Sequence, residues 1–160
     1  MNSRHIFLLL MMVWMAAARG QKRAFQISDL YQIKNVHSPQ ISPDGKRIAF
    51  VVTAYFLEAG KSDADIYLMN LDGNQLKQMT RNPAADFHPF WSPDGQYLYF
   101  LSTRTNGVQL WRLPVDGGEA EQITNFPTGI QNPMMTPGGK AIVFFQHGFS
   151  GMRCRSRLQR

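Results

Sequence analysis

The chain has 160 residues, of which 44% are apolar and 18% are charged, so its composition indicates a folded domain and excludes an intrinsically disordered chain. Its formal charge of +6 comes from six arginines near the two ends, because eleven basic residues balance eleven acidic ones between positions 21 and 150. A nucleic-acid-binding domain carries its basic residues on the folded body. The sequence therefore predicts no nucleic-acid partner.

Residues 1–20 predict an export signal. Arg4 and His5 precede thirteen consecutive apolar residues, and small residues follow before Gln21. This run is shorter than the roughly 20 residues that a spanning helix needs. We expect a cleaved signal peptide, a periplasmic or secreted protein, and no stable membrane anchor. An uncleaved N-terminal membrane helix is the alternative. The only cysteine, Cys154, forms no disulfide within the chain.

Residues 21–36 predict a linker followed by a short capping helix over residues 28–36. Ser28 is a suitable N-cap, and Leu30, Ile33 and Val36 would share one side of the helix. We expect this helix to cover one end of the structure that follows.

A repeated unit dominates the rest of the chain. The string Ser42-Pro43-Asp44-Gly45 recurs at residues 92–95 and, in weakened form, at residues 136–139. Each copy follows a proline three positions earlier and precedes a segment with strand alternation. Later landmarks recur at an offset of 44, whereas the first two copies of the string are 50 apart. The first unit therefore carries six extra residues, which we place within residues 55–63.

Each unit predicts about four short antiparallel strands, the size of one β-propeller blade. In the repeated string, the proline and aspartate suit a type I turn, and the glycine supplies the positive φ that follows it. The predicted fold is an all-β, incomplete propeller over residues 37–149, with blades at about 37–80, 87–124 and 131–149. Four aromatic residues are expected to pack between blades: Phe50, Tyr67, Phe100 and Trp111.

Propellers close with about 4–8 blades, so two complete blades and part of a third cannot close a ring. The repeat pattern ends before residues 150–160, which we expect to form an unstructured basic tail. The favoured interpretation is a fragment of a longer protein, as a frameshift or premature stop would produce. The alternative is a small protein whose ring closes by assembly of three copies.

Four stretches carry a family resemblance. They are Phe25-Gln26-Ile27-Ser28-Asp29-Leu30, Ile41-Ser42-Pro43-Asp44-Gly45-Lys46, Phe90-Trp91-Ser92-Pro93-Asp94-Gly95, and residues 109–120 with Asp116-Gly117-Gly118-Glu119-Ala120 at their end. From about Phe25 to Phe145 the chain resembles exported serine peptidases of the prolyl oligopeptidase family, in the acylaminoacyl-peptidase and dipeptidyl-peptidase-5-like branch. The Trp-Ser-Pro-Asp-Gly string alone is also found in TolB and other periplasmic propellers with WD40-like repeats.

The resemblance implies an N-terminal propeller that admits short peptides to a C-terminal α/β-hydrolase domain. That domain carries the catalytic Ser, Asp and His in that chain order, and we find no counterpart of it here. Ser150 lacks the second glycine of a Gly-x-Ser-x-Gly elbow, and no acid or histidine follows it. We therefore expect peptide hydrolysis only by a full-length parent and an inactive isolated chain. The alternative function is a non-catalytic, TolB-like module that binds an envelope protein.

The remaining polar residues predict no catalytic, cofactor-binding or metal site, and no cofactor. His37, His88 and His147 show no metal-ligand spacing, and we interpret them as loop or blade-end residues bonded to backbone. Asp63 and Asp65 lack the other ligands of a calcium loop, so we expect them to solvate the inserted residues. Four further aspartates are explained by turn chemistry: Asp44, Asp72, Asp94 and Asp116.

Overall fold

The computed structural model describes residues 23–146, which fall into two units, residues 23–30 and residues 31–146. The first unit contains the helix α2 (Ile27–Leu30), none of whose residues is buried. The Asp29 carboxylate accepts the Gln26 N–H at 2.9 Å. The helix predicted over residues 28–36 is therefore too long, because Val36 pairs with Val52 as part of a strand. Within residues 23–146, no helix has the length and apolarity to cross a membrane.

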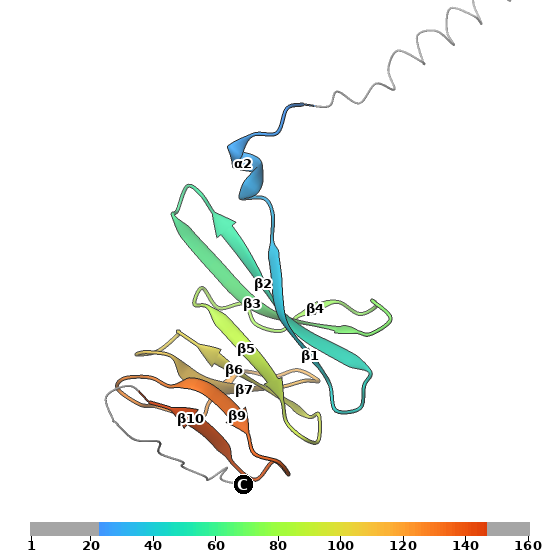
Figure 1. The fold of residues 1–160 in the computed structure, drawn as a ribbon, viewed down its shortest axis with the longest axis vertical. Coiled ribbons are helices and arrows are strands. Elements are labelled where there is room, and N and C mark those ends of the chain that lie inside the picture. The colour runs from blue at the N-terminus through green and yellow to red at the C-terminus, as the bar shows by residue number, and fades with distance from the viewer. Residues whose placement is uncertain (1–22, 147–160) are drawn as a thin grey trace, which may run out of the picture. The chain divides into compact units, whose positions relative to one another are not determined.

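The second unit is all-β and confirms the predicted fold class: two four-stranded blades and part of a third (Figure 1). Blade 1 consists of β1 (Asn35–Ile41), β2 (Arg47–Phe56), β3 (Lys61–Asn70) and β4 (Lys77–Gln78). Blade 2 consists of β5 (Asp86–Trp91), β6 (Tyr97–Ser102), β7 (Gln109–Pro114) and β8 (Glu121–Gln122). Blade 3 contributes β9 (Gln131–Met135) and β10 (Ile142–Phe145). Neighbouring strands in each sheet are antiparallel and follow chain order.

The repeated string forms the turn between the first two strands of each blade. In blade 2 the Gly95 N–H donates to the Ser92 carbonyl at 2.9 Å, and Gly95 has a φ of 69°. The Ser92 hydroxyl accepts the Tyr97 N–H at 2.9 Å and lies 2.5 Å from the Asp94 carboxylate. Ser42 and Thr136 hold the corresponding turns of blades 1 and 3. This geometry confirms the turn chemistry predicted from the sequence.

The six extra residues of the first unit lengthen one hairpin. Strands β2 and β3 pair without interruption from Arg47–Asn70 to Phe56–Lys61, whereas β6 and β7 pair only from Tyr97–Pro114 to Ser102–Gln109. The extended tip exposes three consecutive large apolar residues, Tyr55, Phe56 and Leu57. The insertion therefore lies outside the body of blade 1.

Each blade has two faces, which we define by the neighbour that covers them. The leading face packs against the preceding blade in the sequence, and the trailing face packs against the following one. In the seam between blades 1 and 2, the trailing face of blade 1 meets the leading face of blade 2. The buried residues of this first seam are Ala49, Ile66, Leu68, Trp91, Leu98, Phe100, Leu113 and Val115. A second seam joins blade 2 to blade 3 through Tyr99, Leu101, Leu110, Ile130, Ile142 and Phe144.

The aromatic residues expected between blades divide into two pairs. Phe100 is fully buried in the first seam, and Trp111 packs against that seam. Phe50 and Tyr67, their counterparts in blade 1, stack with ring centroids 6.0 Å apart. This pair belongs to the leading face of blade 1, where the described residues supply no preceding blade.

Candidate functional site at the inner edge of the blades

The first strands of the three blades form the inner edge of the structure. Strand β1 packs against β5, while β4 and β8 are the outermost strands of their sheets. β1, β5 and β9 each pair on one side only, so the backbone groups on their other side are not used within the sheets. Figure 1 shows β5 and β9 running along the same side of neighbouring blades.

All three inner strands are interrupted at the same repeat position. Ser38, His88 and Asn132 have positive φ values of 55°, 55° and 46°, and each is followed by a proline. Pairing with the second strand skips these positions in every blade. A β-bulge re-aims a side chain, and proline removes a backbone donor. The chain therefore places one polar residue per blade outside the regular ladder.

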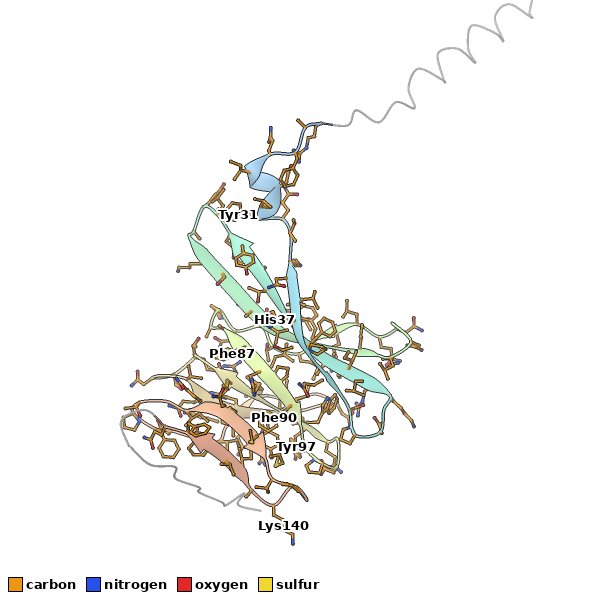
Figure 2. All side chains as sticks on the ribbon, in the orientation of Figure 1. Tyr31, His37, Phe87, Phe90, Tyr97 and Lys140 are labelled. Carbon is orange, nitrogen blue, oxygen red and sulfur yellow. The ribbon has the colours of Figure 1, made fainter. Side chains whose placement is uncertain are left out.

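The polar groups of this edge differ in their surroundings. The half-buried His37 ring has Nδ1 3.0 Å from the Ser38 hydroxyl and Nε2 3.1 Å from the Thr53 hydroxyl. His88 is exposed, and its ring meets Phe90 edge-on at 6.4 Å. Phe90 in turn stacks on Tyr99 at 5.4 Å. Figure 2 shows His37 on β1 and Phe87 and Phe90 on β5.

The polar groups of this edge are hydrogen-bond donors and acceptors. Ser38 and His37 are hydrogen-bonded, but the other ring nitrogen of His37 meets a hydroxyl, so no carboxylate orients the imidazole as in a catalytic triad. Among residues 23–146, no three His, Cys, Asp or Glu side chains gather as a potential metal site. Imidazole, amide and hydroxyl groups can form hydrogen bonds with a ligand, and Phe90 adds an apolar surface beside them.

The histidine interpretation needs correction. His37 and His88 lie within the inner strands β1 and β5 rather than in loops, and His37 bonds to side-chain hydroxyls rather than to backbone. The prolines at the repeat position were visible in the sequence. The bulge before them was not, because positive φ at a serine, histidine or asparagine depends on strand pairing. His147 and Ser150 lie outside the described residues.

Two buried carboxylates lie near the first seam and have structural roles. Asp65 is buried rather than solvating the insertion, so that interpretation is wrong. It accepts hydrogen bonds from the Thr80 hydroxyl at 3.0 Å and the Gln78 amide at 2.7 Å. Asp86 is fully buried and forms an ion pair with Arg104. Burial raises the pKa of both carboxyl groups above the ordinary range, and the hydrogen bonds and the arginine oppose this only in part.

The aspartates of the tight turns behave in the opposite way. The Ser42 hydroxyl and the Lys46 N–H lower the pKa of the Asp44 carboxyl, and the equivalent donors lower the pKa of Asp94. Hydrogen bonds from Asn74 lower the pKa of Asp72. These contacts confirm turn chemistry for the three residues. Asp116 is exposed, and its carboxylate lies 3.8 Å from Arg47.

Four-stranded antiparallel blades stacked face to face define this unit as part of a β-propeller. The family model described as "PD40: TolB beta propeller domain" matches residues 16–157. The chain therefore belongs to the TolB β-propeller family.

Known proteins of two kinds are similar to it. Dipeptidyl-peptidase 5 of Porphyromonas gingivalis is 30% identical over 66 residues, which cover 41% of this chain and 10% of that protein. A TolB-type structure from Agrobacterium tumefaciens has a TM-score of 0.56 and 31% identity, covering 74% of this chain and 41% of that one. The acylaminoacyl peptidase of Pyrococcus horikoshii has a TM-score of 0.60 at 20% identity and covers 72% of this chain and 18% of that one, which supports the fold alone. The chain thus spans a minor part of each of these relatives.

Proposed function

We propose that this chain is the propeller portion of an exported serine peptidase of the prolyl oligopeptidase family, admitting short peptides to a separate hydrolase domain. The observation that carries the proposal is the inner edge. It offers hydrogen-bonding groups from the exposed His88 and Asn132, whereas both ring nitrogens of His37 already meet hydroxyl groups and no carboxylate orients that ring. The similarity to dipeptidyl-peptidase 5 supports a peptide as the ligand. The predicted signal peptide supports export to the periplasm or beyond.

The geometry of the inner strands favours transient contact with a peptide. An extended peptide binds a free strand edge through backbone hydrogen bonds. Here each free edge is broken after one to three residues by a bulge and the proline that follows it, Pro39, Pro89 or Pro133. A peptide can therefore form only short runs of backbone hydrogen bonds and must exchange them from blade to blade. Weak, distributed contacts of this kind suit passage along the edge better than tight capture.

A peptide-binding measurement tests this proposal. A short neutral peptide carrying fluorescein should bind the chain with a measurable rise in anisotropy and should be recovered uncleaved. The double variant His88→Ala, Asn132→Ala should weaken binding by about fivefold, the equivalent of one lost hydrogen bond. Lys77→Ala, on the outermost strand of blade 1, is the control and should bind normally. Equal affinity of all three forms, or cleavage of the peptide, would contradict the proposal.

A second candidate is a TolB-like module that binds a folded envelope protein. The 31% identity to a TolB-type structure over 74% of this chain favours it. This function predicts no affinity for short peptides and binding to a folded periplasmic protein through the same edge. The anisotropy experiment separates the two candidates, because peptide binding that depends on His88 and Asn132 is expected only for a peptidase propeller.

A further inference from the structure

Asp65 occupies a repeat position at which blade 2 has an uncharged side chain, Gln109. In blade 1 the Thr80 hydroxyl donates to Asp65 Oδ1 at 3.0 Å, and in blade 2 the Thr124 hydroxyl donates to Gln109 Oε1 at 2.9 Å. Each threonine hydroxyl also accepts the N–H of the residue that follows the buried side chain, at 3.0 and 2.9 Å. The two blades therefore form the same set of contacts, once around a carboxyl group and once around a neutral carboxamide.

The surroundings of Asp65 supply no positive charge. The residue is 8% exposed, and the charged groups that face it are Asp63 on its own strand and Asp86 on β5, which packs against β3. Arg104 forms an ion pair with Asp86, and no basic side chain in the described part of the chain pairs with Asp65. The Gln78 amide donates to Asp65 Oδ2 at 2.7 Å, and because a carboxamide carries both a donor and an acceptor, it can partner either a carboxylate or an acid. A buried carboxylate without a counter-charge is costly, so this site favours the neutral acid.

The direction of the pKa shift agrees with this geometry. Burial is the main cause that raises the pKa of the Asp65 carboxyl, and the negative charges of Asp63 and Asp86 raise it further, against the hydrogen bonds from Thr80 and Gln78. In the unfolded chain the same carboxyl ionises at about pH 3.9. Between that pH and the raised pKa, the folded chain holds a proton that the unfolded chain has lost. The free energy of unfolding therefore falls as the pH rises through this window.

We propose that Asp65 is a proton-binding position of the first seam, a neutral acid while blade 2 packs on blade 1 and a carboxylate once the two blades separate. Blade 2 acts on the proton through β5, which packs against β3 and places the negative charge of Asp86 near Asp65. Asp86 has the Arg104 guanidinium as its counter-charge and Asp65 has none, so the proton belongs to Asp65. The seam is thus a pH-sensitive contact, which mild acid stabilises and base weakens.

Urea unfolding of the full 160-residue chain between about pH 4 and pH 8 tests the proposal. Tryptophan fluorescence reports the first seam, since Trp91 is buried in it and Trp111 packs against it. Asp65→Asn places a neutral group of the same shape at the site. The ratio of the wild-type to the variant unfolding constant should rise with pH, by up to about tenfold per pH unit for one proton, and then level off above the raised pKa. The ratio isolates Asp65, because every other titrating group is present in both proteins.

Asp72→Asn is the matched control, since it makes the same change at an exposed turn carboxyl whose pKa is lowered by hydrogen bonds from Asn74. The corresponding ratio for this variant should not rise with pH anywhere in the range. A purely structural contribution of Asp65 would give a ratio that is the same at every pH. A constant ratio for Asp65→Asn, or one that falls as the pH rises, would overturn the proposal.

A second variant tests the role of blade 2. Asp86→Asn removes a negative charge near Asp65 and leaves Arg104 without its partner, and both changes favour the Asp65 carboxylate. In this background the rise in the ratio should end at a lower pH, whereas an unchanged profile would overturn the assignment of the proton to the seam. Far-UV circular dichroism must match the wild type for every variant. Where an asparagine variant fails that test, Asp65→Gln or Asp86→Val replaces it, because other blades carry glutamine and valine at these positions.

Discussion

At the scale of single residues, one hydroxyl per blade organises the first turn. Ser92 is buried, donates to Asp94 at 2.5 Å, and accepts the N–H of Tyr97 at 2.9 Å. The same pair of contacts recurs at Ser42, whereas Thr136 keeps the backbone contact opposite a glycine at position 138. The hydroxyl thus satisfies a backbone donor at the start of the second strand. Because blade 3 forms this turn with a glycine at the position of Asp94, the turn does not require the aspartate.

Ser92→Ala should therefore destabilise the fold by about 1–3 kcal/mol, because it leaves the Tyr97 N–H without an acceptor. The free energy of unfolding is measured by urea titration followed by circular dichroism. Ser92→Thr is the control, and it should unfold close to the wild type because Thr136 already performs this role in blade 3. An alanine variant that unfolds at the wild-type midpoint would show that the hydroxyl is not needed.

At the scale of elements, the long hairpin of blade 1 is an addition to a blade that is otherwise like its neighbour. The pair Val52–Asp65 in blade 1 corresponds to the pair Ser102–Gln109 in blade 2. Beyond it, blade 2 needs only residues 103–108, whereas blade 1 continues as a paired ribbon with an apolar tip. The blade 1 residues of the first seam, Ala49, Ile66 and Leu68, lie in the part of the hairpin that both blades share.

Replacing residues 53–64 with the sequence of residues 103–108 should leave the blade folded. The loop becomes shorter, which changes the closure entropy by less than about 1 kcal/mol, and the replacement begins with a threonine that can keep the contact of Thr53 with His37. Thermal unfolding should shift little. Leu68→Ala, on the same hairpin but inside the first seam, is the contrasting variant and should lose about 2–5 kcal/mol. Comparable losses in both proteins would mean that the extension stabilises the blade.

At the scale of the whole molecule, adjoining blade faces bury apolar side chains together with a few polar groups. Asp86 is the clearest polar case, because the equivalent positions in blades 1 and 3 hold Val36 and Ile130. Its partner Arg104 also lies over Trp111, with its guanidinium carbon 4.7 Å from the ring centroid. Blade 2 thus has a paired carboxylate at a repeat position that is aliphatic in the other two blades.

Arg104→Leu should cost about 3–5 kcal/mol, since it leaves a buried carboxylate without its counter-charge. The double variant Asp86→Val, Arg104→Leu should recover most of that loss, because the repeat itself uses aliphatic residues at the position of Asp86. Arg112→Leu breaks the more exposed pair with Glu121 and should cost no more than about 1 kcal/mol. Chemical unfolding of the three variants measures these differences. A double variant as unstable as Arg104→Leu would contradict the expectation.

The sequence by itself determined the blades, their turns and their order, because serine, proline, aspartate and glycine act within a few residues of one another and strand alternation is equally local. Only the tertiary structure decided which face each aromatic residue occupies, that Asp65 and Asp86 are buried, and that Ser38, His88 and Asn132 lie in bulges. It also ended the predicted helix at Leu30 and made Asn35 and Val36 the start of β1, since Val36 pairs with Val52 from a distant segment. These features depend on contacts between residues far apart in the chain, and local patterns do not encode which distant strand or blade a side chain will meet.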